Sequence, residues 1–179
     1  MALADAILVC LTDRPMSGYD LAKTFDASIG FFWRASHQQV YRELARLRDR
    51  GLVKSQEIEQ EGKPNRIVHT ITKSGKQAIY NWSTKPCATP SLKDELLVKL
   101  YALDHVHIPT LREQFEVRRD QRMARLNAYL RIKEKYYDGK KLTRAQQGKF
   151  IALTLGINDE TEAIKNLDKA ILMLQAIKE

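Results

Sequence analysis

The order of periodic segments over the first 82 residues constrains the fold most strongly. Three segments with helical spacing of apolar residues precede two short runs in which β-branched and polar residues alternate. The predicted elements are helices at 2–12, 18–28 and 36–50, strands at 52–60 and 67–72, and a helix at 73–82. A turn at 61–66 joins the two strands into a hairpin. Few small domains place three helices before one hairpin, so this order predicts a winged helix-turn-helix domain.

The third helical segment has a clear start, an apolar stripe and a clear end. Ser36 is a typical N-cap and Gly51 a typical C-terminal stop. Three apolar residues at spacings of four and three share one helical face: Val40, Leu44 and Leu47. The other faces carry Gln, Tyr and Arg, which match base edges and phosphates. We therefore predict that 36–50 is a recognition helix that enters the major groove of DNA.

The DNA contacts are expected at the N-terminal end of this helix and on the hairpin turn. Gln pairs with adenine and Arg with guanine, and a stiff basic turn enters the minor groove or follows a phosphate strand. The predicted DNA-binding residues are Ser36, His37, Gln38, Gln39, Tyr41, Arg42, Lys63, Asn65 and Arg66. Glu43, Asp49 and Glu61 weaken the positive field. Arg46 and Arg50 are therefore either phosphate contacts or part of a solvated face.

The charge of the chain favours an anionic partner. The net charge is +8, with +4 from residues 1–85 (13 minus 9) and +4 from the remainder (17 minus 13), so the charge is not a basic tail. Nucleic acid is favoured over a membrane surface, and no apolar run is long enough to span a bilayer. Cys10 and Cys87 are too few for a disulfide framework or a zinc site. The N-terminal apolar run carries Asp5 and lacks the basic leading region of a signal peptide, so the chain is expected to be cytoplasmic.

A segment with two prolines divides the chain. We predict a DNA-binding domain at 1–85, a linker at 86–90 and a helical domain at 91–179. In the last of these, helices are expected at 91–104 with Ser91 as N-cap, at 109–137, and from Thr143 onward with a kink or break at 156–159. The final part has a coiled-coil-like seam: Ile164, Leu167, Ile171 and Leu174. The predicted fold is mainly α: an α+β winged helix-turn-helix domain followed by an all-α antiparallel helical dimerisation domain. A monomeric bundle is the alternative to a homodimer.

Several stretches resemble the PadR family of bacterial transcriptional regulators. They are PMSGYDL (15–21), VYREL (40–44), GLV (51–53), GKPNR (62–66) and TITKSG (70–75). SIGFFWRASHQQVYREL and EGKPNR look closest to the virulence-activator branch of the family. The resemblance covers 1–85 well and implies a homodimer on a pseudo-palindromic operator, with Tyr41, Arg42, Lys63 and Arg66 near DNA. In the helical domain, Arg118, Arg119 and Arg122 interrupt the apolar stripe and depart from the expected packing.

Other function classes are less favoured. A phosphate-binding loop, a nucleophile elbow and a paired-carboxylate site are all missing from the sequence, so an enzyme is not expected. His105 and His107 have no further ligand at a suitable spacing, and neither a metal nor a cofactor is predicted. The alternative is a winged helix used for protein–protein interaction without specific DNA binding. The polar face from Gln38 to Arg42 argues against it, because protein interfaces favour an apolar centre.

Aromatic residues raise the question of a small-molecule effector. Phenolic compounds are effectors of some members of the family, which makes an aromatic pocket an alternative to ordinary core packing. The aromatic residues concerned are Phe31, Phe32, Trp33, Phe115, Tyr129, Tyr136 and Tyr137. Aromatic side chains at helical spacing more often form the core.

Overall fold

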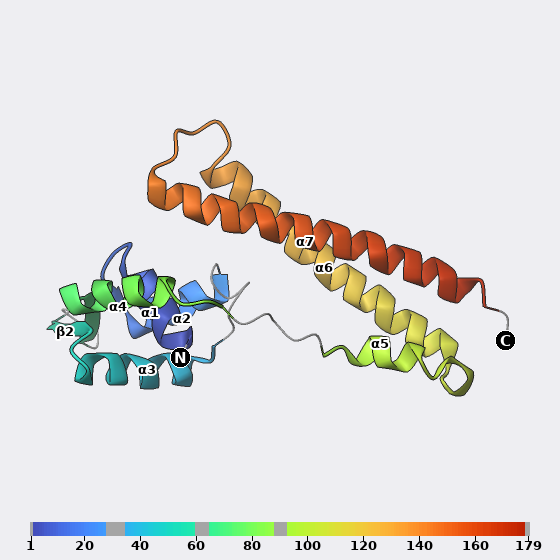
Figure 1. Ribbon diagram of the computed structural model, residues 1–179, viewed down its shortest axis with the longest axis horizontal. Helices are drawn as coiled ribbons and strands as arrows, with labels where there is room; N and C mark the ends of the chain where they lie inside the picture. The colour runs from blue at the N-terminus through green and yellow to red at the C-terminus, as the bar shows by residue number, and fades with distance from the viewer. Residues whose placement is uncertain (1, 28–34, 60–64, 88–92, 178–179) are drawn as a thin grey trace. The chain divides into compact units, whose positions relative to one another are not determined.

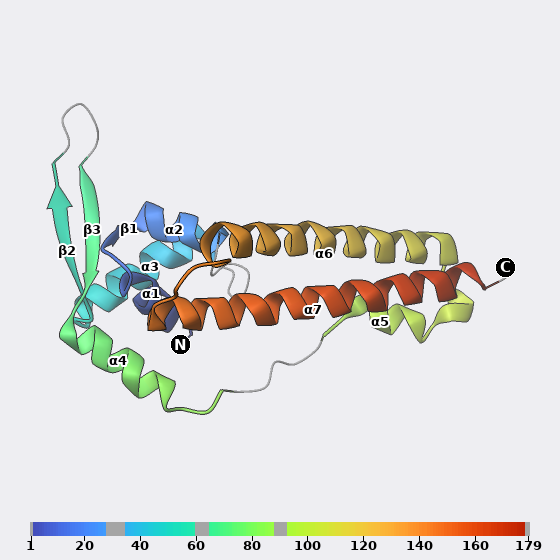
Figure 2. The same cartoon turned by 90° about the horizontal axis from the view of Figure 1, so that it is seen from above.

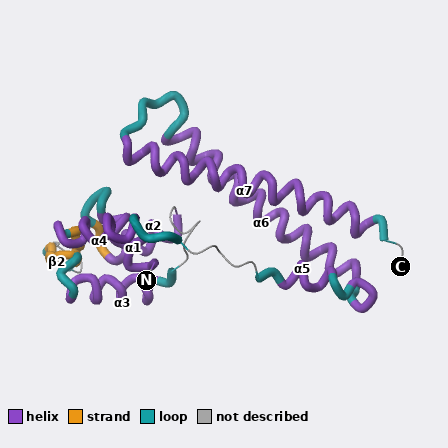
Figure 3. The backbone as a smooth tube through the Cα atoms, viewed as in Figure 1, coloured by secondary structure: helices purple, strands orange, loops and turns teal. Residues whose placement is uncertain are grey.

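The computed structural model describes residues 2–27, 35–59, 65–87 and 93–177 (Figures 1 and 3). The chain divides into two compact units, Met1–Pro90 and Ser91–Glu179. Several predictions fall on residues outside the described ranges: the aromatic residues 31–33, most of the turn at 61–66 with Lys63, the linker residues 88–90, and Ser91 as a cap.

The first unit has the predicted winged helix-turn-helix order. Its elements are α1 (Ala2–Leu11), β1 (Met16–Ser17), α2 (Gly18–Ala27), α3 (His37–Asp49), β2 (Val53–Ile58), β3 (Arg66–Ile71) and α4 (Lys73–Ser83). Gly51 follows α3 with a φ of 68°, in the left-handed region that favours glycine, and so it stops the helix before β2. The mainly α fold, with a small sheet in the first unit, is confirmed.

The sheet contains one strand that the sequence did not predict. β1 pairs antiparallel with β3 (Met16 opposite His69, Ser17 opposite Val68), where only a helix break was expected. Two residues are too few to show an alternating pattern, so this strand had no signal in the sequence. β2 pairs with the other side of β3, from Val53 opposite Ile71 to Ile58 opposite Arg66. Figure 2 shows the long β2–β3 hairpin with β1 beside β3.

One apolar core joins the helices of the first unit to the base of the hairpin. Its most completely buried large side chains are Ile7, Leu8, Leu21, Phe25, Val40, Leu44, Leu47 and Val53. The predicted stripe of α3 therefore faces the core, which fixes the side of α3 that remains outside. Cys10 is buried in the same core, whereas Cys87 is exposed.

The second unit is a long helical pair with a short helix packed against it. Its elements are α5 (Glu95–Leu100), the 3-10 turn η2 (Leu103–His105), α6 (Ile108–Tyr136) and α7 (Arg144–Gln175). α6 and α7 run side by side in both views (Figures 1 and 2). The start of α7 is as predicted, because Thr143 and Gln146 form a capping box. The core between the helices contains Leu96, Leu111, Phe115, Ile171 and Leu174.

Two predictions for this unit were wrong. The segment 91–104 is not one helix: α5 begins at Glu95, where the Asp94 carboxylate accepts a hydrogen bond from the Leu96 N–H. The predicted kink or break at 156–159 is absent, since α7 runs unbroken through these residues. Gly156 is buried in α7, where tertiary packing overrides its weak helix propensity.

The arginines that interrupt the apolar stripe of α6 are paired within the unit. Arg118 Nη1 lies 2.5 Å from Asp94 Oδ2, and Arg119 Nη1 lies 3.6 Å from Asp168 Oδ1. Arg122 bonds the buried Glu160 of α7. These arginines therefore form ion pairs that join α6 to the start of α5 and to α7. Among the described residues, no helix is long and apolar enough to cross a membrane.

Candidate nucleic-acid interface

The start of α3 is fixed by two of the predicted DNA-binding residues. The Ser36 N–H donates to Gln39 Oε1 over 2.8 Å, and the Gln39 N–H donates to Ser36 Oγ over 3.3 Å. This reciprocal pair is a capping box, so Ser36 is the N-cap that the sequence predicts, and Gln39 completes it. Ser36 and Gln39 thus hold the end of α3 on which the other predicted contacts lie.

The outer row of α3, formed by Gln38 and Arg42, is polar and exposed. With about 100° between successive residues, Gln38 and Arg42 lie opposite the buried stripe, and Tyr41 lies on one flank. His37, Gln38, Tyr41 and Arg42 are all exposed. Within the described ranges, the side chains of Gln38 and Arg42 make no hydrogen bond or ion pair. Their donors and acceptors are therefore available to a partner.

The other arginines of α3 are partly neutralised. Arg46 Nη1 lies 3.2 Å from Glu43 Oε2, and Arg48 Nη2 lies 3.2 Å from Asp49 Oδ1. These exposed pairs contribute little to stability, but they lower the positive potential on the flanks. The cationic group that stands out on the outer face is therefore that of Arg42.

The described part of the wing turn is engaged with its own unit. Asn65 Nδ2 donates to Glu57 Oε1 over 2.9 Å, near the turn end of the β2–β3 hairpin. Arg66 Nη2 donates to Asp20 Oδ2 on α2. Asn65 and Arg66 are consequently held in place, and Lys63 lies outside the described residues.

Asp20 collects three donors at one carboxylate oxygen. Besides Arg66, Oδ2 accepts the Ser17 N–H over 3.0 Å and the Ser17 hydroxyl over 2.9 Å. Partial burial would raise the pKa of Asp20, but the hydrogen bonds from Ser17 and Arg66 and the charge of Arg66 hold it below its usual value. The link from Asp20 to Arg66 spans 46 residues and leaves no local signal in the sequence.

A second contact to the start of α2 involves Tyr41. A Cβ atom added at Gly18 would lie 2.3 Å from Tyr41 Cε1, so the ring occupies the space of a side chain at position 18. Tyr41 remains 50% exposed on its other side. This contact between α2 and α3 was also missed, because sequence spacing says nothing about packing between separate helices.

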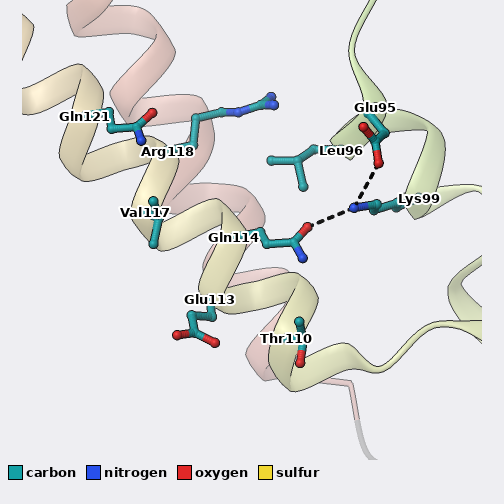
Figure 4. Close-up of a pocket in the computed structure, with 9 residues that line it drawn as sticks. All are labelled: Glu95, Leu96, Lys99, Thr110, Glu113, Gln114, Val117, Arg118 and Gln121. Atoms are coloured by element: carbon teal, nitrogen blue, oxygen red, sulfur yellow. Dashed lines mark hydrogen bonds and ion pairs between the residues drawn. The ribbon is translucent and has the colours of Figure 1, made fainter.

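Three of the aromatic residues considered for an effector pocket pack within the helical unit. Phe115 and Tyr129 are each only 2% exposed, as ordinary packing residues of the helical unit. Tyr137 packs against Phe150, with ring centroids 5.3 Å apart. None of these three lines the cavity of about 500 Å³ between α5 and α6, in which Lys99 bonds Glu95 and Gln114 (Figure 4).

His107, which directly precedes α6, has a structural role. His107 Nδ1 accepts the Thr110 N–H over 3.3 Å and so caps α6. The described residues contain no cluster of three or more His, Cys, Asp or Glu side chains that could hold a metal ion.

Comparison with known proteins identifies the family of both units. The family model "Transcriptional regulator PadR-like family" matches residues 7–81, and "Virulence activator alpha C-term" matches residues 92–175. The probable transcriptional regulator Rv1176c of Mycobacterium tuberculosis is 33% identical, over 98% of both chains. The chain belongs to the PadR-like family of transcriptional regulators. It is therefore a transcriptional regulator of this family rather than an enzyme.

Two solved structures match nearly the whole chain. Bacillus subtilis PadR in complex with operator DNA has 28% identity and a TM-score of 0.83, over 97% of this chain and 99% of that one. The Vibrio cholerae virulence activator AphA has 32% identity and a TM-score of 0.79, over 98% and 99%. Bacillus subtilis PadR has also been solved in complex with p-coumaric acid.

Proposed function

We propose that this PadR-like regulator binds DNA sequence-specifically, as a homodimer on a pseudo-palindromic operator. In this proposal the N-terminal part of α3 reads bases in the major groove. The wing at 61–66 contacts the minor groove or the phosphate backbone. Residues 1–85 form the DNA-binding domain, 86–90 the linker and 91–179 the dimerisation domain.

The observation that carries the proposal is the outer row of α3. Gln38 and Arg42 lie opposite the buried stripe on a helix whose inner face and N-terminus are both fixed. A recognition helix needs this arrangement: rigid placement, and base-matching groups that bond nothing else. The likeness to Bacillus subtilis PadR, which was solved in complex with operator DNA, supports DNA binding by this chain. His37 and Tyr41 flank the row as further contacts, and Ser36 and Gln39 present the start of the helix to a phosphate.

The homodimer is supported by the surface of the helical unit. Among its described residues, this unit exposes many large apolar side chains by more than a third: Leu97, Val98, Tyr101, Val117, Met123, Leu130, Ile151, Leu155, Leu172 and Met173. Apolar surface of this extent marks an interaction site. A twofold dimer covers the same surface on both chains and presents two recognition helices to two half-sites.

Fluorescence anisotropy tests the proposal directly. The full chain is titrated onto a duplex from upstream of its own gene and onto a scrambled duplex, at near-physiological salt and across a salt series. Preference for the native duplex with a steep salt slope supports the proposal. If the chain binds the native duplex no better than the scrambled one, a genome-wide selection is used to search for another operator. Failure to enrich any sequence, or no binding even at low salt, overturns the proposal in favour of a protein-interaction module.

The same assay tests for an effector. A phenolic acid such as p-coumaric acid, the compound bound in the PadR structure, is added to the preformed complex. Release of the duplex at constant salt supports an effector-responsive regulator. An unchanged anisotropy up to millimolar acid removes phenolic acids from the proposal and leaves DNA binding standing.

A further inference from the structure

We infer that residues 17–20, which span the end of β1 and the first turn of α2, position the DNA-reading side chains of both the recognition helix and the wing. Gly18 restricts the position of the Tyr41 ring by packing against it, and Asp20 restricts the position of the Arg66 guanidinium by a hydrogen bond. Neither Gly18 nor Asp20 is among the proposed DNA contacts. The inference rests on the proposed function, because it concerns how the contacts to DNA are held ready.

The contact at Gly18 leaves no room for a Cβ atom unless the Tyr41 ring moves. Three ring atoms of Tyr41 lie 2.3, 2.9 and 3.0 Å from the place of a Cβ at position 18. Separations under 3.0 Å require something to move, and here it is a ring that is otherwise half-exposed. The backbone of Gly18 thus supplies a flat support for Tyr41. The support restricts the ring beside Arg42, the residue proposed to read a base.

The hydrogen bond to Asp20 restricts the rotamers of Arg66, a long and partly exposed side chain. Ser17 donates twice to Asp20 Oδ2, so the carboxylate is already fixed where Arg66 meets it. Arg66 uses Nη2 for this bond, and its guanidinium has further N–H groups that can still donate to a phosphate. A long side chain ordered before binding does not lose that freedom when the complex forms.

The backbone ties the same turn to the wing. Ser17 pairs with Val68 on β3, two residues from Arg66. The turn at 17–20 is therefore connected to α3 through Gly18, to the base of the wing through Asp20, and to β3 through Ser17. A change in this turn is expected to alter DNA recognition without removing a group that touches DNA.

The test uses double-mutant cycles measured on DNA with the full chain. Asp20→Asn retains an oxygen for the Ser17 donors but removes the charge that holds Arg66. We expect the ratio of operator to scrambled-duplex affinity to fall about two- to tenfold. In the Arg66→Ala background the same change is expected to leave the ratio unaltered.

The second cycle pairs position 18 with position 41. Gly18→Ala should lower operator affinity about tenfold, because the new methyl group displaces the Tyr41 ring. In the Tyr41→Ala background it should cost nothing further. Gly148→Ala is the matched control, since a Cβ at this helical glycine meets no atom within 4 Å. Glu59→Gln controls for loss of one negative charge from the same unit.

The outcomes separate the inference from the proposed function. Thermal unfolding by circular dichroism confirms that each variant is folded. If Gly18→Ala fails to fold, the Asp20 cycle decides alone. If the wild-type chain recognises an operator but Asp20→Asn and Gly18→Ala lose nothing, the positioning role is wrong. Losses that are equally large without Arg66 or Tyr41 also overturn it. A wild-type chain that distinguishes no sequence overturns the proposed function itself.

Discussion

Arg122 on α6 donates from Nη1 to Oε2 of Glu160 on α7 over 3.1 Å. Arg125, one turn further along α6, donates to the other carboxylate oxygen over 2.8 Å. Glu160 is only 4% exposed, so these two guanidinium groups replace the water that its carboxylate loses on burial. The pairing forms only when α6 and α7 meet in one register.

The first prediction follows from this arrangement. Glu160→Gln leaves two arginines without their counter-charge and only one side-chain oxygen to accept from them. We expect the free energy of unfolding to fall by about 1–3 kcal/mol. Urea unfolding of the full chain, followed by circular dichroism, measures the change.

Glu162 provides the control two residues away. It is exposed, and among the described residues its carboxylate bonds Lys165 on the same helix. Glu162→Gln should change the free energy of unfolding by less than about 0.5 kcal/mol. Equal losses for the two variants would show that Glu160 has no special role in joining the helices.

The second prediction concerns pH and the cap of α5. The hydrogen bond from Arg118 holds the pKa of Asp94 below its usual value, against the opposing effect of partial burial. A carboxyl with a lowered pKa stabilises the fold above its unfolded-state pKa, and this stability is lost as the pH falls through the folded value. Asp94→Asn keeps a capping oxygen but should cost about 1 kcal/mol near neutral pH.

The difference between wild type and Asp94→Asn should therefore depend on pH. We expect it to be constant from pH 7 to about pH 5 and to shrink below about pH 4, where the Asp94 carboxyl takes up a proton first in the unfolded chain and, at lower pH, in the folded chain. Urea unfolding at a series of pH values measures both curves. A difference that stays the same down to pH 3 would contradict a role for the charge.

The third prediction concerns base reading by Arg42. If Arg42 pairs with a guanine, Arg42→Ala should weaken operator binding by about 1–3 kcal/mol and binding to a scrambled duplex much less. Arg46→Ala is the control, because Arg46 already pairs with Glu43 on the flank. Anisotropy on both duplexes measures the ratio. An equal loss by Arg42→Ala on both duplexes would make Arg42 a phosphate contact.

The fourth prediction concerns the dimer. Light scattering after size exclusion should give the wild-type chain about twice its mass of 20.6 kDa. A charge placed within the dimer interface should yield monomers, because burying an unpaired charge is costly. Val98→Glu, Leu155→Glu and Leu172→Glu sample exposed apolar side chains on α5 and α7, and Gln147→Glu is the polar control. Dimers in all three variants would exclude these side chains from the interface.

Local signals in the sequence were sufficient for most of the first unit. Three local signals define α3: the N-cap Ser36, the apolar stripe from Val40 to Leu47, and the stop at Gly51. Features that depend on contact between distant segments were missed. β1 exists because β3 lies beside it, and Asp20 meets Arg66 only in the folded unit.

The second unit shows the same limit. Thr143 correctly predicts the start of α7. The weak helix propensity of Gly156 wrongly predicts a kink, because its burial depends on contacts that the sequence does not show. In the sequence, three arginines of α6 interrupt the apolar stripe. In the folded unit they pair with Asp94, Asp168 and Glu160, which lie far away in the sequence. For the proposed site, exposure of residues on α3 was predictable from helical spacing, whereas their supports on α2 were not.

The shared space at positions 18 and 41 has a consequence for how this family varies. The Tyr41 ring fills the volume that a side chain at 18 would need. Across relatives the two positions should therefore covary, with larger residues at 18 accompanied by smaller ones at 41. A relative that carries a larger residue than glycine at 18 is expected to lack the aromatic ring at 41. Its operator preference is expected to differ as well.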